Sequence, residues 1–296
     1  MAMRVARHSL AVFFAVYAVC SLAALAQGRP LKILLTNDDG FDSAGLKVMR
    51  TALVAAGHQV TVVAPAVNQS STSMSMTSGT LKVEDKGDGV WAVHGTPADA
   101  VALGLVHILR DMPQDLVVSG TNAGQNLGNS ANGSGTVSAA IAASRLGVPA
   151  IATSAGLGAD IGTAYNVAAA LTTQMITALA SGRAASGKLL ADRLVINMNV
   201  PALPSARLLG IRWAPLSKRS SYTRVYTAGE NAGEVRSRLA LATEPVAEND
   251  TDLALFNQGY VTLTVLDGDL GAPAPASSPL VTLLSTLALP VTAGQY

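Results

Sequence analysis

The chain has 296 residues, with 20 basic and 19 acidic side chains and a formal net charge of +1 at pH 7. This balance gives no broad field of either sign, which argues against binding of nucleic acid polymers or of a charged membrane surface. Its one cysteine, Cys20, falls in a predicted signal peptide, so the mature chain cannot form disulfides, zinc-thiolate sites or a cysteine nucleophile.

Residues 1–26 have the order of a secretory signal peptide. Arg4 and Arg7 precede an apolar run, residues 10–26, that ends in a small-x-small cleavage signal. We expect cleavage before Gln27 and a secreted or periplasmic protein with no membrane contact; an uncleaved anchor is the alternative. Cleavage removes two arginines and no acid, which leaves 18 basic against 19 acidic side chains and a net charge of −1.

Strands and helices alternate in the predicted core, residues 27–215. The strands are expected at Lys32–Thr36, Gln59–Ala64, Leu116–Val118, Ala150–Thr153 and Leu194–Asn197, and the helices at Ala44–Ala56, Pro97 to about Leu109, Val137–Leu146 and Thr163–Ala180. The first strand is continuously apolar, as is typical of a strand buried on both faces. The alternation predicts an α/β fold, a Rossmann-like three-layer sandwich with a mainly parallel sheet.

The character of the sequence changes after this core. Residues 216–260 carry several arginines with little helical periodicity, and we expect an extended arm or hairpin over 216–258 that serves as an oligomer contact. Residues 261–296 are expected to form a C-terminal strand, a Pro- and Ala-rich linker over 271–279 and a tail helix over 279–290.

Polar clusters follow four of the predicted strands, at the edge where ligands bind in open α/β sheets. The first is Asn-Asp-Asp-Gly at 37–40. Adjacent carboxylates repel each other, and a hard divalent cation offsets that repulsion; an ordinary turn is the alternative. The second cluster contains Ser70 and, taken alone, is most consistent with an ordinary polar loop. The fourth contains Ser154, after the fourth strand, and is most consistent with a structural role.

The third cluster, residues 119–136, is rich in Gly, Asn, Ser and Thr. Such a composition is also that of a flexible linker, but a loop this long between a buried strand and a helix is usually functional. Gly133-Ser134-Gly135-Thr136 opens the helix, where free amides and the helix dipole suit phosphate. The segment has neither a Walker lysine nor a Gly-x-Gly-x-x-Gly pattern.

Other catalytic schemes fit poorly. The sequence contains no Gly-x-Ser-x-Gly and no His-Glu-x-x-His. The histidines beyond the signal peptide are His58, His94 and His107. His94, which precedes Gly95-Thr96, is the one that can face the functional edge, although packing is the more common role of such a histidine.

Together these segments resemble the SurE family of nucleotidases and acid phosphatases. The resemblance rests on ILLTNDDG (33–40), VTVVAPAVNQS (60–70), VHGTPADAV (93–101), DLVVSGTNAGQNLG (115–128), SGTVSAA (134–140), GVPAIATS (147–154), INMNVP (196–201) and TDLALFNQGYVTLT (251–264). These segments occur in the family's order across most of the chain. Where the family usually has a glycine and an aromatic residue, this sequence has Ser71 and Gly133.

The resemblance implies one divalent ion per subunit, Mg²⁺ or Mn²⁺. Its ligands would be Asp38, Asp39, Ser70 and Asn122, with the two aspartates also catalytic, and the phosphate side would be formed by Asn126, Ser134, Gly135 and Thr136. It further implies a homodimer or homotetramer that exchanges a C-terminal hairpin between subunits.

The expected activity is metal-dependent hydrolysis of small phosphomonoesters, chiefly nucleoside monophosphates, by a metal-activated water. Sequence does not separate the roles of the two aspartates as ligand and as base. Two alternatives remain at this stage. One is an exported acid phosphatase of broad specificity with little base recognition, and the other is a non-catalytic protein that binds nucleotide or phosphate.

Overall fold

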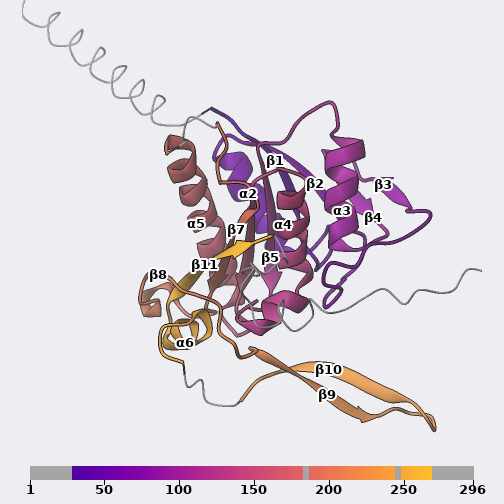
Figure 1. The fold of residues 1–296 in the computed structure, drawn as a ribbon, viewed down its shortest axis with the longest axis vertical. Coiled ribbons are helices and arrows are strands. Elements are labelled where there is room, and N and C mark those ends of the chain that lie inside the picture. The colour runs from indigo at the N-terminus through magenta and orange to yellow at the C-terminus, as the bar shows by residue number, and fades with distance from the viewer. Residues whose placement is uncertain (1–28, 183–186, 244–247, 269–296) are drawn as a thin grey trace, which may run out of the picture.

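The computed structural model describes residues 29–182, 187–243 and 248–268. In this part of the chain nine strands form one sheet, in the order β3-β4-β2-β1-β5-β6-β7-β11-β8 (Figure 1). The strands are β1 (Lys32–Thr36), β2 (Gln59–Pro65), β3 (Val83–Asp85), β4 (Val90–Val93), β5 (Leu116–Ala123), β6 (Ala150–Ala155), β7 (Leu194–Val200), β8 (Ile211–Trp213) and β11 (Val261–Asp267). Within this sheet only the β3–β4 and β7–β11 pairs are antiparallel, so the prediction of a mainly parallel sheet is confirmed.

Helices cover both faces of the sheet. The pair α2 (Ala44–Ala55) and α5 (Ile161–Ser181) packs on one face, and α3 (Pro97–Leu103) and α4 (Gly135–Arg145) pack on the other (Figure 1). Strand β1 supplies both cores, because Ile33 and Leu35 face one helix pair and Leu34 the other. Each of these fully buried side chains contributes roughly 1.5–3 kcal/mol relative to exposure.

The start of α3 follows from its sequence. The Thr96 hydroxyl accepts a hydrogen bond from the Asp99 N–H at 3.1 Å, and the Asp99 carboxylate accepts one from the Thr96 N–H at 2.9 Å. With Pro97 at the first helical position, this is the capping box that the sequence indicates. The helix continues as a π-helical turn, Gly104–Ile108, and so ends where it was predicted to end.

Strand β1 lies between β2 and β5, and all three are parallel. From β1 the chain first adds β2 and β4 on one side, and later adds β5, β6 and β7 on the other. The carboxyl ends of β1 and β5 therefore flank the point where the winding direction reverses. In sheets of this kind, that crevice is where ligands bind.

A hairpin of β9 (Tyr222–Ala228) and β10 (Val235–Leu241) projects away from the core (Figure 1). The chain then returns as α6 (Asp252–Gln258), which packs against β11. The arm predicted over 216–258 thus contains a helix at its end, and the extended part is shorter than expected. The helix forms because Thr251 caps it and Leu253 and Ala254 are buried.

Several predictions concern residues outside the described part of the chain. They are the signal peptide over 1–26, the linker over 271–279 and the tail helix over 279–290. Among the described residues, no helix combines the length and the apolar character needed to cross a membrane.

Candidate metal and phosphate site

The turn after β1 is fixed by Asn37. Its side-chain amide donates to the Gly40 carbonyl at 3.0 Å and to the Ser43 hydroxyl at 2.7 Å, while its side-chain oxygen accepts from the Gly40 N–H at 3.2 Å. Gly40 has φ +110°, which favours glycine. The two aspartates between them are therefore presented by a rigid turn at the end of a strand that is buried from Ile33 to Thr36.

Asp38 carries a carboxyl group in an environment that resists its ionisation. Its side chain is 3% exposed. The pKa of Asp38 is raised to about 6 as the net result of several effects. Burial raises it most, the hydrogen bond that the Thr136 hydroxyl donates at 2.6 Å lowers it, and the neighbouring Asp39 charge raises it. The pKa of Asp39 is also raised by burial. Among the described residues, neither carboxylate forms an ion pair with Lys, Arg or His.

Hydrogen bonds join the ends of three strands around these carboxylates. The Gln69 N–H, after β2, donates to the Asp38 carbonyl at 2.7 Å. The Ala123 N–H, at the end of β5, donates to the Asp39 carboxylate at 2.8 Å, and the Asn68 amide approaches the other Asp39 oxygen at 3.4 Å. Segments far apart in sequence are thus held at one point of the sheet edge.

A cavity of about 400 Å³ opens at this point. Five of the eight predicted site residues are among those that line it: Asp38, Ser70, Asn122, Asn126 and Ser134. Asp39 lies beside it through its contacts with Asn68 and Ala123. Gly135 and Thr136 contact Asp38 and are not among the lining residues; a Cβ on Gly135 would lie 2.7 Å from the Asp38 Cβ. Their predicted contact with phosphate stays a prediction.

The Asn122 side chain is oriented by its own loop. Its amide nitrogen donates to the Gly124 carbonyl at 2.6 Å, which leaves the side-chain oxygen as an acceptor. The pairing of β5 with β6 shifts register between Ser119 and Asn122, and such a bulge re-aims the side chains that follow it.

Hydrogen bonds fix the orientation of Asn126, and their partners were not predicted from the sequence to belong to the site. Its N–H donates to the Asn199 side chain at 2.7 Å, its amide donates to the Ser154 hydroxyl at 2.9 Å, and its carbonyl accepts from the Asn197 amide at 2.9 Å. Asn197 and Asn199 alternate on β7 and are fully buried. Two asparagines at a spacing of two residues in an apolar strand are the signal that points to such a role.

Helix α4 begins at the cavity. The Ser134 side chain caps it by accepting from the Val137 N–H at 3.1 Å, and its hydroxyl proton stays available to donate. The first-turn amides and the helix dipole favour an anion at this position.

The donor set fits a hard divalent cation. Such ions prefer carboxylate, amide and hydroxyl oxygens, and the cavity edge offers two carboxylates with raised pKa values together with the Ser70 hydroxyl and the Asn122 oxygen. Among the described residues, this site included, no group of three or more His, Cys, Asp or Glu side chains is placed to hold a metal. The neutral oxygens are therefore essential to this candidate site.

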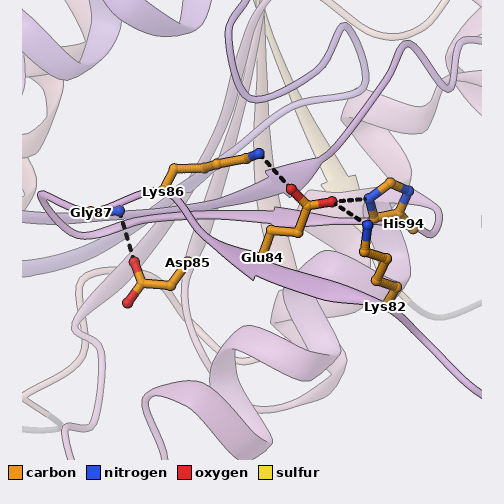
Figure 2. A network of polar contacts seen from close by, with 6 residues as sticks. All are labelled: Lys82, Glu84, Asp85, Lys86, Gly87 and His94. Atoms are coloured by element: carbon orange, nitrogen blue, oxygen red, sulfur yellow. Dashed lines mark hydrogen bonds and ion pairs between the residues drawn. The ribbon is translucent and has the colours of Figure 1, made fainter.

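His94 belongs to a different group of residues. Figure 2 shows Glu84 between Lys82, Lys86 and His94; the His94 ring lies 2.7 Å from the Glu84 carboxylate. Hydrogen bonds from Lys82, Lys86 and His94 keep the pKa of Glu84 below its usual range. His94 is not among the residues lining the cavity, so the alternative that it takes part in the functional site gains no support.

Comparison with known proteins gives consistent matches. A family model described as "Survival protein SurE" matches residues 33–223, a range that includes all eight predicted site residues. Proteins named 5'/3'-nucleotidase SurE from Yersinia pestis (strain Pestoides F) and Yersinia pseudotuberculosis serotype O:1b (strain IP 31758) are each 38% identical over 245 residues, which is 82% of this chain and 92% of theirs. The crystal structure of the SurE protein from Aquifex aeolicus matches with a TM-score of 0.68 and 33% identity, over 81% of this chain and 94% of that one.

Proposed function

The chain belongs to the SurE family, and from this we infer that it is a 5'/3'-nucleotidase, a phosphoric monoester hydrolase that acts on nucleoside monophosphates with a divalent metal. The observation that carries the proposal is the pair of adjacent carboxylates, buried Asp38 and half-buried Asp39, at the switch point of the sheet. They lie beside a cavity that is also lined by Ser70, Asn122 and the start of α4.

We propose that Asp38, Asp39, Ser70 and Asn122 hold one Mg²⁺ or Mn²⁺. A cation bound there supplies Lewis-acid polarisation of the phosphoryl group and lowers the pKa of a water molecule. It also balances two carboxylates that otherwise resist ionisation, since burial raises the pKa of both.

The chain's own groups account for the remaining requirements. Ser134 and Asn126 line the cavity, and their hydroxyl and amide would donate to phosphoryl oxygens as charge develops on them; the dipole at the start of α4 would favour the same charge. One of the two aspartates accepts the proton of the attacking water. The network from Asn197, Asn199 and Ser154 fixes Asn126, so this donor needs no reorganisation during the reaction.

The proposal is tested by phosphate release from AMP. We expect release in Mg²⁺ or Mn²⁺, its loss in EDTA and its recovery when metal is restored. Asp38→Asn should remove at least about a hundredfold of kcat/KM, in the range typical of lost catalytic groups. The matched control is Asp42→Asn, at an exposed acid four residues away. Unchanged metal-dependent release in Asp38→Asn would disprove the assignment, and AMP binding without turnover would favour a binding protein.

A second candidate, a broad-specificity acid phosphatase, is supported by one observation. Gly133 lines the cavity, and a Cβ built on it meets nothing within 4 Å, so the cavity has open space where the family usually has an aromatic side chain. Equal kcat/KM for AMP and for glycerol phosphate would favour this alternative.

We also propose that the protein is a homodimer or homotetramer that uses the hairpin as a contact. Tyr226 and Val235 are large, apolar and exposed on β9 and β10, as expected for a surface that a partner covers. Light scattering after gel filtration should give a multiple of the monomer mass, and Val235→Lys should reduce it. A monomer in the unmodified protein would rule the proposal out.

For localisation, we propose export directed by residues 1–26, on the sequence pattern given above. Cell fractionation and N-terminal sequencing of the mature protein test it. A first residue at Gln27 in the exported fraction is expected, and an intact N-terminus in the cytoplasmic fraction would contradict it.

A further inference from the structure

A second cavity, of about 510 Å³, adjoins the candidate site. The two cavities share three lining residues, Leu157, Ser220 and Tyr222, and so are contiguous. The second cavity lies between the base of the hairpin, the loop after β6 and helix α6. None of the residues proposed to hold the metal or the phosphate lines it.

The two cavities differ in chemistry. The candidate site is lined by a carboxylate, by amides and hydroxyls, and by the Arg224 guanidinium, which suits a cation and a phosphoryl group. The described residues that line the second cavity include no carboxylate and one charged side chain, the exposed Arg219; the rest of the wall has apolar side chains such as Leu157, Leu253 and Phe256, and neutral amides from Gln125 and Asn257. Apolar surface together with neutral donors and acceptors suits an uncharged, flat, hydrogen-bonding group, and an arginine guanidinium can stack on such a ring.

Tyr222 stands between the two cavities. It begins β9 and reaches the end of β5, where a Cβ on Gly124 would lie 2.8 Å from its hydroxyl. Gly124 is also the residue whose carbonyl orients Asn122. The ring therefore lies next to the predicted metal ligand on one side and next to the second cavity on the other.

The hairpin register explains how one element lines both cavities. Leu241 pairs directly with Tyr222, and Leu239 pairs with Arg224, so these four side chains share one face of the hairpin. Leu241 lines the second cavity, Arg224 and Leu239 line the candidate site, and Tyr222 lines both. The hairpin residues from Arg224 onward lie beyond the segment that the family model matches.

We propose that the second cavity is a nucleoside subsite, which takes the base of a nucleoside monophosphate while its phosphate lies at Asp38 and Ser134, with Tyr222 as the residue between the two. This inference rests on the proposed nucleotidase function and adds to it the location of base recognition. It assigns base preference to the hairpin and α6, not to the metal-binding loops.

Ala242→Phe is the test variant, because Ala242 is exposed, lines the second cavity and does not line the candidate site. The added ring fills the proposed subsite. Ala228→Phe is the matched control, an exposed alanine on the same hairpin that lines neither cavity. The measured quantity is kcat/KM for AMP divided by kcat/KM for glycerol phosphate, which has no base.

We expect Ala242→Phe to lower this ratio at least about tenfold, the scale of a lost apolar contact in a pocket, and Ala228→Phe to leave it at the wild-type value. An unchanged ratio in Ala242→Phe overturns the subsite while the nucleotidase activity stands. Calorimetry with adenosine, which lacks a phosphate, keeps the test independent of turnover. Adenosine binding to the wild type that is lost in Ala242→Phe supports the subsite. Equal adenosine binding to both proteins, or no binding to either, contradicts it. Absence of AMP hydrolysis by the wild type counts against the proposed function alone.

Discussion

Asp38 is the residue in which stability and function oppose each other most directly. Its pKa in the metal-free fold is about 6 against an ordinary value of 3.8. Because the folded state binds the proton more tightly than the unfolded state, this group favours folding at low pH. Its contribution is lost as pH rises from about 4 to about 6, and the cost of the buried charge is complete above that range.

Replacing Asp38 by Asn should therefore stabilise the metal-free protein. The Asn oxygen can still accept the hydrogen bond from the Thr136 hydroxyl, and the buried charge is gone. We expect the free energy of unfolding in EDTA at pH 8 to rise by about 1–3 kcal/mol, while metal-dependent activity is lost. Urea denaturation of Asp38→Asn beside Asp42→Asn measures this, and a less stable Asp38→Asn would contradict the electrostatic account.

The same carboxyl group predicts how metal affinity depends on pH. A proton and a cation compete for Asp38, so Mn²⁺ affinity should be constant above about pH 6 and should weaken by about tenfold per pH unit, or more, below it. Titration of Mn²⁺ followed by electron paramagnetic resonance between pH 5 and pH 8 tests this. An affinity independent of pH over that range would mean that Asp38 is not a ligand.

Two glycines near the start of α4 give a matched comparison. A Cβ on Gly135 would lie 2.7 Å from the Asp38 Cβ and 3.0 Å from the Pro97 ring, whereas a Cβ on Gly133 meets nothing within 4 Å. We expect Gly135→Ala to cost about 1–3 kcal/mol of stability by overpacking and to weaken Mn²⁺ binding by displacing Asp38. Gly133→Ala should be neutral or slightly stabilising. Equal stability and Mn²⁺ affinity in the two variants would show that Gly135 does not set the position of Asp38.

At the scale of the elements, Asp252 joins α6 to the rest of the site. Its fully buried carboxylate accepts hydrogen bonds from the N–H groups of Gly128 and Ser217, each at 2.8 Å, and from that of Leu253 at 2.7 Å. Burial raises the pKa of this carboxyl group, and these N–H donors offset part of that effect. One side chain thus ties the loop after β5, the base of the hairpin and α6 together.

Asp252→Ala should accordingly loosen both the loop and the hairpin base. It leaves the buried N–H groups of Gly128 and Ser217 without an acceptor, at a cost of roughly 1–3 kcal/mol each. We expect a markedly lower melting temperature and faster amide exchange over residues 124–130. Asp250→Ala, at an exposed acid on the same loop, is the control. Protection of residues 124–130 that equals that of the control would contradict this role.

The elements differ in how far sequence predicts them. The core strands and helices were predictable because their apolar periodicity is local and strong. Short edge strands such as β3 and β8, and helix α6, were not predicted. Helix α6 has only seven residues. It is stabilised by a contact distant in sequence, because the Asp252 carboxylate accepts a hydrogen bond from the Gly128 N–H, and no local pattern reveals that contact.

At the scale of the whole molecule, the candidate site follows from topology. That polar clusters would meet at one edge was predictable, because each follows a predicted strand and the carboxyl ends of parallel strands share one edge. The choice of Ser70 and Asn122 within those clusters came from the family resemblance, because a polar loop alone does not distinguish a ligand from an ordinary turn residue. The second cavity was not predictable, because its wall combines residues near 156, 222, 242 and 256 that are adjacent only in the folded chain. The support of Asn126 by β7 was missed for the same reason.

The central claim is that oxygen donors from the ends of β1, β2 and β5 hold one divalent cation that hydrolysis requires. A crystal grown with Mn²⁺ and measured for anomalous scattering tests it most directly. The account predicts one strong peak per subunit within bonding distance of Asp38, Asp39, Ser70 and Asn122. A peak at another position, or none in crystals of protein that hydrolyses AMP in the same Mn²⁺ buffer, would contradict it.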